Sequence, residues 1–258
     1  MIYPSAEHAW VAHIQDLLAA PQQRLMQYLV KWTVSVGHGR VAQPPQIIRD
    51  LIDDSQGGER YGACGLKMTC TQWNMNKIFP LMLWKENGSS LKRMLQDPRF
   101  VQPTAQSKKD NWSSIFGRIG MQRKGLNQSY VEYFLQRWTH APTRGLPIFY
   151  FDPEPPEYVL QPMINNPKMI RHNRVANSCI MAVSLKYESK PDCLFVSIMM
   201  RSNLWTHTYG DIFGGSYIGL AFCQELGIGN CQTSLFMPSS AADDKPTMRA
   251  ILNYYKEN

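Results

Sequence analysis

The residues best suited to chemistry in this chain are a thiol and a guanidinium at the two ends of a predicted β-hairpin. Cys179 opens a run with strand character, and Arg201 follows a second such run from Cys193 to Met200. A polar turn, Glu188 to Asp192, separates the two runs. In an antiparallel hairpin the start of one strand lies beside the end of the other. We therefore predict that Cys179 and Arg201 lie together, where the positive charge favours the reactive thiolate.

A loop and a helix are predicted after the hairpin. The segment from Asn203 to Gly215 contains several glycines and is expected to be a loop. An amphipathic helix is expected from about Ser216 to Leu226, and Gly227 is placed to end it.

The order of motifs in this stretch resembles that of the thymidylate synthase and pyrimidine hydroxymethylase family. In that family a nucleophilic cysteine is followed by a hairpin, Gln-Arg-Ser, an Asn or Asp, and a helix that starts with Ser-Tyr. The corresponding steps here are Ser178-Cys179-Ile180, the hairpin, Met200-Arg201-Ser202, Asp211-Ile212 and Ser216-Tyr217. An earlier block also matches in order: Ile115 to Arg118, Met121 to Arg123, a helix, Pro142 to Leu146 and a strand. The resemblance covers residues 110–226.

The resemblance implies nucleophilic catalysis on a pyrimidine nucleoside monophosphate. The Cys179 thiolate would add to C6 of the ring, and C5 would then attack a one-carbon unit from 5,10-methylenetetrahydrofolate. Arg201 would hold the phosphate through two parallel hydrogen bonds, and Ser202 would add a hydroxyl donor. The alternatives are a buried free cysteine at 179 and a structural ion pair at 201.

Two further arginines are candidates for phosphate binding. Arg144 matches a family step with two adjacent arginines, although Gly145 replaces the second. By resemblance, Arg144 would reach a phosphate across the interface of a homodimer whose subunits pack sheet to sheet. Arg60 ends the loop from Ser55 to Arg60, in the region where the family places a phosphate-binding loop. The alternative for Arg60 is a solvated arginine beside a turn.

Asp211 favours cytosine as the base. A carboxyl group accepts a hydrogen bond from the amino group of cytosine and, when protonated, donates one to N3. The family's cytosine hydroxymethylases resemble this sequence in having Asp at this step. The alternative is that Asp211 caps the helix that follows. We therefore expect C5 hydroxymethylation of a cytidylate, with methylation or a uridylate substrate left open.

Two departures from the family pattern favour a different function. Leu81 stands where the family has a glutamate three residues before a tryptophan, here Trp84. Glu86 lies past that tryptophan and would face another direction on a helix. The segment 238–244 lacks the His and Tyr that bind the sugar hydroxyl in the family. The alternative function is therefore a non-catalytic protein of the same fold that binds a nucleotide or a partner.

Composition limits the class of protein. The 258 residues suffice for one large domain, and a net charge of +7 indicates an anionic partner. Because that charge is scattered, a nucleic-acid-binding function is the least favoured. The 6 cysteines form no CxxC pair, so we expect no structural zinc and reduced thiols in the cytoplasm. We expect neither a signal peptide nor a membrane span.

The predicted elements indicate a single α/β (α+β) domain over residues 1–258, with a helical N-terminal part to about residue 95. By resemblance it would be thymidylate synthase-like, with a large mixed sheet flanked by helices. We predict helices over Ser5–Ala20, Gln22–Val36, Pro44–Asp54, Asn127–His140 and Pro246–Lys256, and strands over Gly145–Asp152 and Thr233–Met237. Cys193, Cys223 and Cys231 are expected to be core residues.

Overall fold

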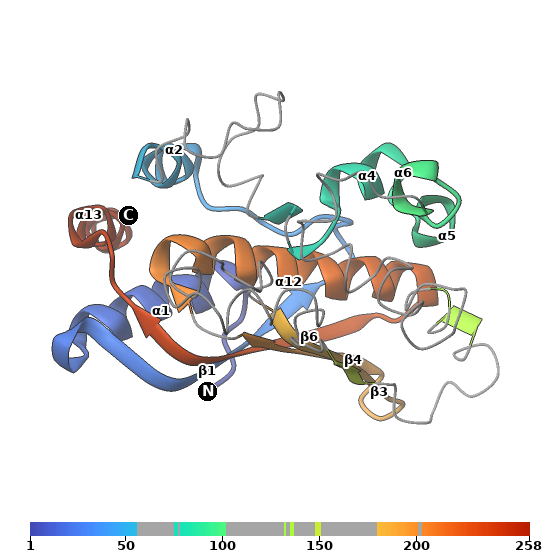
Figure 1. Cartoon of the computed structure of the whole chain (residues 1–258), viewed down its shortest axis with the longest axis horizontal. Coiled ribbons are helices and arrows are strands. Elements are labelled where there is room, and N and C mark those ends of the chain that lie inside the picture. Colours follow the sequence, from blue (N-terminus) through green and yellow to red (C-terminus); the bar gives the residue numbers. More distant parts are fainter. Residues whose placement is uncertain are drawn as a thin grey trace, which may run out of the picture.

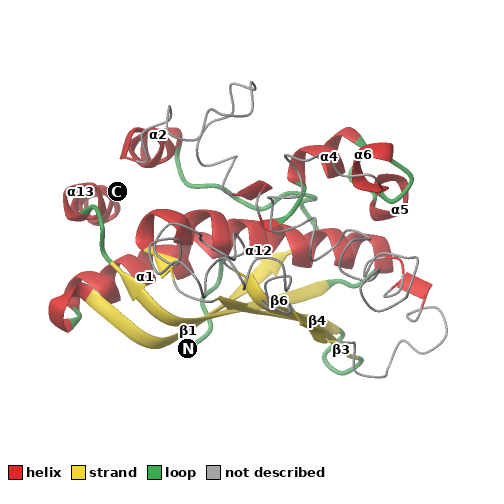
Figure 2. Cartoon of the chain, in the orientation of Figure 1, coloured by secondary structure: helices red, strands yellow, loops and turns green. Residues whose placement is uncertain are grey.

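The structure is a computed structural model that describes residues 1–55, 75–76, 78–101, 132, 135–136, 148–150, 180–200 and 203–258. These residues form a layered arrangement of helices over a sheet (Figures 1 and 2). The predicted combination of a mixed sheet with flanking helices is confirmed for this part of the chain.

The described strands form one sheet of six strands in the order β1-β6-β4-β3-β2, with β5 also beside β6. Their bounds are β1 Arg24–Ser35, β2 Ile148–Tyr150, β3 Ile180–Glu188, β4 Cys193–Met200, β5 Asn203–Leu204 and β6 Asn230–Ala241. β6 pairs in parallel with β4 and β5, whereas the other pairs are antiparallel. The sheet is therefore mixed, and β6 is the strand that joins its two halves.

Helices cover one face of this sheet, which we call the inner face. The described helices are α1 Ala6–Ala19, α2 Gln46–Ser55, α4 Leu81–Glu86, α5 Leu91–Met94, α6 Pro98–Val101, α12 Trp205–Leu226 and α13 Lys245–Glu257, with a short 3₁₀ turn at Pro21–Gln23. α12 contacts β1, β4 and β6, and α1 contacts both β1 and α12. α2, α4, α5 and α6 lie on the side of α12 away from the sheet (Figure 1). α12 is thus enclosed between two layers.

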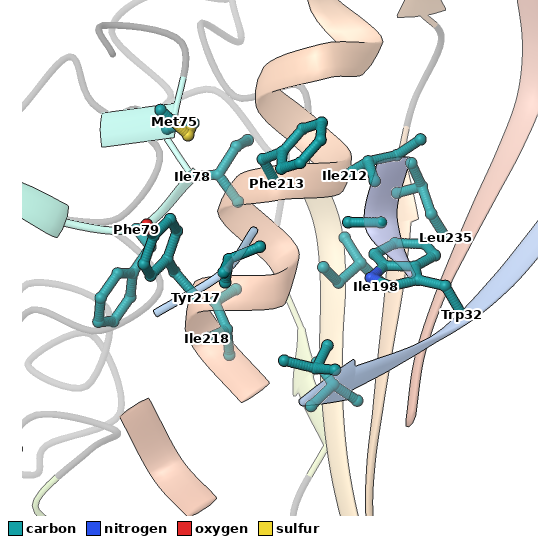
Figure 3. Close-up of a cluster of buried hydrophobic side chains, with 14 of the residues drawn as sticks. Trp32, Met75, Ile78, Phe79, Ile198, Ile212, Phe213, Tyr217, Ile218 and Leu235 are labelled. Carbon is teal, nitrogen blue, oxygen red and sulfur yellow. The ribbon is translucent and has the colours of Figure 1, made fainter. Parts of the chain in front are cut away.

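The hydrophobic core lies around α12. Trp32, Ile198 and Leu235 reach the helix from the sheet, while Ile78 and Phe79 reach it from the other side (Figure 3). All five of these side chains are buried. A helix covered in this way must be apolar around most of its circumference, and nearly every residue of α12 from Trp205 to Cys223 is buried.

The helix predicted over Gln22–Val36 is wrong, because this segment forms β1. It pairs with β6 from Arg24 opposite Ala241 to Ser35 opposite Asn230. Val30, Trp32 and Val34 alternate as buried residues, which is the period of a strand. The apolar spacing of Leu25, Met26, Leu29 and Val30 also fits a helix, but pairing with β6 supplies backbone hydrogen bonds that outweigh local preference. The N-terminal part is therefore not wholly helical.

The loop predicted over Asn203–Gly215 is also wrong, because α12 already begins at Trp205. Its glycines permit close packing. An ideal Cβ on Gly214 would lie 2.6 Å from Ile78 Cβ, and one on Gly215 would lie 2.6 Å from Ile198 Cδ1. Asp211 lies inside this helix, so its predicted alternative role as a helix cap is wrong as well.

Other predicted elements agree with the structure. The Ser5 side chain caps α1 by accepting a hydrogen bond from His8 N at 3.3 Å. The β3–β4 hairpin, α2, β6 and α13 all lie where the sequence predicts them, with ends displaced by a few residues. Cys193, Cys223 and Cys231 are buried, as predicted. The predicted helix Asn127–His140 lies almost entirely outside the described residues, and β2 lies within the predicted strand Gly145–Asp152.

Candidate functional site

The predicted site begins at the open end of the β3–β4 hairpin. Ile180 pairs with Met200 at that end, with a register irregularity between Ile180 and Ala182. The next residues along the chain are Cys179 and Arg201. Both lie outside the described residues, so their contact stays a prediction. The predicted site residues Ser202, Arg144 and Arg60 lie outside the described residues too.

The open end of the hairpin and the start of α12 lie at the same end of the sheet. Met199 of β4 pairs with Phe236 of β6, and Asn203 of β5 pairs with Ser240 a short distance further along β6. β5 then continues directly into α12 at Trp205. β6 therefore pairs with the strands that lie immediately before and after the Arg201–Ser202 dipeptide.

Asp211 is the only predicted site residue within the described part of the chain. It lies inside α12 and its side chain is only 5% exposed. Gly214 and Gly215 follow it by three and four residues, so all three lie on neighbouring parts of one helix side. Gly214 faces Ile78, and Gly215 faces Ile198 of β4. Asp211 thus lies near the boundary between the sheet and the segment that leads into α4.

An aromatic cluster joins α4 to α12. The rings of Trp84 and Tyr217 meet edge to face with centroids 6.2 Å apart, and Phe79 lies 5.8 Å from Trp84. The Lys85 ammonium lies 5.8 Å from the centre of the Tyr217 ring. Trp84 is buried, and its Nε1 has no hydrogen-bond partner among the described residues. The cluster forms an apolar wall along the side of α12 away from the sheet.

No carboxylate stands where the family pattern has one in α4. Leu81 begins this helix and is 4% exposed among apolar neighbours. Glu86, the nearest acidic residue after Trp84, forms an exposed ion pair in which Arg99 Nη1 lies 2.6 Å from Glu86 Oε2. Because Glu86 is paired with Arg99 at the surface, its carboxylate does not replace the glutamate that the family pattern has at the position of Leu81.

The segment that replaces the family's sugar-binding step has structural contacts instead. Ser239, Ser240 and the residues around them pair with β1 as part of β6. Asp243 Oδ2 accepts a hydrogen bond from Thr206 Oγ1 at 2.9 Å, and Asp244 caps α13 by accepting from Thr247 N at 3.2 Å. These carboxylates hold α12 and α13 in place.

Sequence reasoning missed a polar cluster on α12. The Tyr209 hydroxyl donates a hydrogen bond to Gln43 Oε1. Burial raises the pKa of Tyr209 above its ordinary value, and burial is also the main cause of the raised pKa of Tyr217. Both phenols are therefore neutral hydrogen-bonding groups at neutral pH. The predicted loop over residues 203–215 concealed this cluster, because Tyr209 gains a fixed position only once that segment is a helix.

A buried histidine and serine were missed as well. His13 Nε2 lies 3.0 Å from Ser240 Oγ, and both residues are fully buried. Burial lowers the pKa of His13 to about 3, so the ring is neutral at pH 7. Tyr28 packs against this ring and donates to Asp16 Oδ2 at 2.7 Å. These side chains connect α1 to β1 and β6. In the sequence, nothing about the position of His13 on α1 distinguishes it from an ordinary core residue.

Within the described ranges, no group of three or more His, Cys, Asp or Glu side chains is placed to hold a metal ion. None of the helices described is both long and apolar enough to cross a membrane.

Comparison with known proteins finds similarity among solved structures alone, and that similarity is distant. No protein-family model and no curated protein matches the chain. Among solved structures, the chain is similar to thermostable thymidylate synthase A from Bacillus subtilis, with a TM-score of 0.45 and 9% sequence identity over 92% of this chain and 79% of that chain. A similarity of this degree establishes neither a common fold nor a common activity.

Proposed function

We propose that this protein is a pyrimidine C5 one-carbon transferase whose nucleophile is Cys179. The observation that carries the proposal is the register of the β3–β4 hairpin, in which Ile180 and Met200 form the last described pair. The chain neighbours of that pair are the thiol and the guanidinium that the motif order singles out. The motif order around them resembles that of the thymidylate synthase and pyrimidine hydroxymethylase family.

The chemistry starts from the low reactivity of a pyrimidine ring toward electrophiles at C5. The Cys179 thiolate adds its electron pair to C6, and the C5–C6 double-bond electrons move onto C5 and the carbonyl system. C5 then forms a bond to an electrophilic one-carbon unit and loses its hydrogen as a proton. Expulsion of the thiolate from C6 restores the double bond and frees the enzyme.

Substrate binding in this proposal depends on a phosphate and a base edge. Arg201 and Ser202 hold the phosphate of the nucleoside monophosphate, and Arg144 and Arg60 add further positive charge. Asp211 reads the base, and a carboxyl group there favours cytosine over uracil. Cytidylate is thus the preferred substrate.

By resemblance, the one-carbon donor is 5,10-methylenetetrahydrofolate, which would supply the electrophilic carbon. The described residues do not fit all of its chemistry. Leu81 is buried where the family has a glutamate, and Glu86 is paired with Arg99 at the surface. The proposal therefore extends to nucleotide binding, thiolate addition and C5 activation, and not to steps that need this carboxylate.

The test is release of tritium from C5-labelled dCMP, CMP and dUMP, with and without the folate donor. We expect release from at least one nucleotide, and Cys179→Ala should lower the rate by about a thousandfold or more. Arg201→Ala should raise KM for the nucleotide more than it changes kcat, because it binds the phosphate. Cys193→Ala is the matched control, since this thiol lies at the opposite end of the hairpin, where Cys193 pairs with Glu188. Absence of release from all three nucleotides would refute the enzymatic function.

A second candidate function is a non-catalytic protein of the same fold that binds a nucleotide. The buried Leu81 favours it, as does the structural use of Asp243 and Asp244 where the family binds sugar. Nucleotide binding measured by thermal shift, without any activity that depends on Cys179, would establish this function in place of the first.

We also propose that the chain forms a homodimer through the face of the sheet opposite α12, which we call the outer face. A groove of about 520 Å³ on this face is lined by apolar and hydroxyl side chains together with Lys31. Leu29 is 51% exposed there and Met199 is 38% exposed. Sedimentation of the purified protein would test this, and a monomer at micromolar concentration would contradict it.

A further inference from the structure

Two buried thiols meet where the C-terminal end of α12 reaches β6. Cys223 lies on α12 and Cys231 on β6, and both are free cysteines with 0% exposure. Gly219 lies one helical turn before Cys223, and a Cβ atom at Gly219 would overlap the Cys231 sulfur. The Cys231 sulfur is therefore packed against the same side of α12 that carries Cys223.

The two cysteines lie close together at this junction. Cys223 Sγ lies 3.7 Å from the carbonyl oxygen of Asn230, the residue before Cys231. A hydrogen bond between the Cys223 and Cys231 thiols, followed by burial, raises the pKa of Cys223 well above its usual range. The helix end between them is turned sharply at Gly227, which has a φ of 70°, and Ile228 N donates to Cys223 O at 2.9 Å. This turn is what brings β6 back beside Cys223.

A third thiol nearby is oriented differently. In β4, Val196 and Ile198 face the glycines of α12. Because side chains alternate along a strand, Cys193 points to the outer face. Cys193 is 7% exposed, against 0% for the other two. Cys193 is therefore a neighbouring thiol that lies on the other face of the sheet from Cys223 and Cys231.

We propose that Cys223 and Cys231 form an intramolecular disulfide bond under oxidising conditions, and that this bond fastens α12 to β6. The proposal stands on the placement of both sulfurs where α12 meets β6, and it does not depend on the proposed enzymatic activity. Its consequence is a covalent link between the central helix and the sheet that forms in the presence of an oxidant and is opened by a thiol reductant.

The reaction balances with hydrogen peroxide as the oxidant. One thiolate attacks an oxygen of the peroxide, the O–O bond breaks, and a sulfenic acid and one water are formed. The second thiol then attacks the sulfenic sulfur, the S–S bond forms, and a second water leaves. Two electrons pass from the thiols to the peroxide. Burial and the raised pKa of Cys223 make the reaction slow at neutral pH.

The experiment treats the folded full-length protein with hydrogen peroxide, alkylates remaining thiols after unfolding, and maps the peptides by mass spectrometry. We expect a linked pair of peptides that contain Cys223 and Cys231, with the loss of two hydrogen atoms. Closing a loop of nine residues should raise Tm by about 5 °C, and dithiothreitol should reverse the change. Recovery of both cysteines as free alkylated thiols after prolonged oxidation would overturn the proposal.

Variants separate this pair from the other thiols. Cys223→Ala and Cys231→Ala should each abolish the linked peptide and the rise in Tm, while Cys193→Ala should retain both. If Cys193→Ala also removes the link, or if the linked peptides contain Cys193, the assignment is wrong. Should a variant fail to fold, the peptide map of the unmodified chain decides the question alone.

Discussion

The two faces of the sheet differ in how tightly they are packed. On the inner face, Gly215 and Gly219 of α12 bring the helix against the side chains of β4 and β6 so closely that even a Cβ atom would overlap them. On the outer face, Ser184, Ser197 and Ser234 form a row across β3, β4 and β6, and Ser234 Oγ donates to Ser197 Oγ at 3.1 Å. The same strands therefore carry a fixed core on one side and a tolerant surface on the other. Asp211 belongs to the helix that packs on the inner face, whereas the outer face carries the groove of the proposed homodimer.

The largest effect should come from filling the closest contact on the inner face. Gly219→Val adds three carbon atoms where the Cys231 sulfur already lies, so either α12 or β6 must move. We expect a loss of about 3 kcal/mol in the free energy of unfolding, or failure to fold. Urea denaturation measures this, and Ser197→Val on the outer face is the control. If the two variants lost the same free energy of unfolding, the inner face would not be more tightly packed than the outer face.

Acid should weaken the inner face through His13. In the unfolded chain His13 binds a proton below about pH 6.5, whereas in the folded protein its pKa is lowered to about 3. The unfolded state therefore binds more protons between these values, and stability is full above pH 6.5 and falls as the pH drops toward 3. We expect a loss of about 3 kcal/mol by pH 4 from this residue.

His13→Gln provides the control for the acid effect. Its side chain can still hydrogen-bond Ser240 Oγ but does not titrate, so the variant should have a flatter profile of stability against pH. If both proteins lose stability equally between pH 7 and pH 4, the acid sensitivity belongs to other groups.

Removing one hydrogen bond at the inner face should have a moderate effect. Trp32 Nε1 donates to Ser216 Oγ at 2.7 Å, and both residues are buried. Ser216→Ala leaves the indole N–H without this acceptor, so we expect a loss of about 1 to 2 kcal/mol. Chemical denaturation measures the loss. An unchanged stability would mean that another acceptor, such as a buried water, replaces the hydroxyl.

The smallest effect on unfolding should come from the outer face. Leu29→Ser alters a side chain that is 51% exposed, so we expect a change within about 0.5 kcal/mol when the subunit concentration is low. At higher concentration the same variant should weaken the proposed homodimer, which sedimentation can measure. A loss above 1 kcal/mol in the dilute protein would show that Leu29 is packed within one subunit.

Sequence patterns predicted the β3–β4 hairpin because alternation and a polar turn are local signals. They also predicted α1, which has a capping serine and apolar residues on one side, and α13, which is amphipathic. The patterns failed for β1, where Leu25, Met26, Leu29 and Val30 have helical spacing but the deciding partner, β6, lies some two hundred residues away. Local sequence does not contain that pairing.

The glycines of α12 caused the opposite error, because a helical segment was predicted to be a loop. Gly210, Gly214 and Gly215 suggested a loop, yet the helix tolerates them because close contacts with Ile78 and Ile198 compensate for their low helix preference. For the candidate site, the sequence placed Asp211 in a loop, whereas it lies inside α12. It could not have identified Tyr209 with Gln43, or His13 with Ser240, because these pairs are formed only by tertiary packing.

The position of β6 in the sheet has a consequence for the order of events during synthesis. β1 is made early, but its partner β6 emerges only after almost two hundred further residues, which takes about 10 to 40 s at ordinary rates of translation. The β3–β4 hairpin can assemble as soon as it leaves the ribosome, whereas β1 must wait with its apolar residues unpaired. A nascent chain stalled before residue 230 thus has two separate halves of a sheet and no strand to join them. We expect such a chain to depend on chaperones that bind exposed apolar segments until β6 arrives.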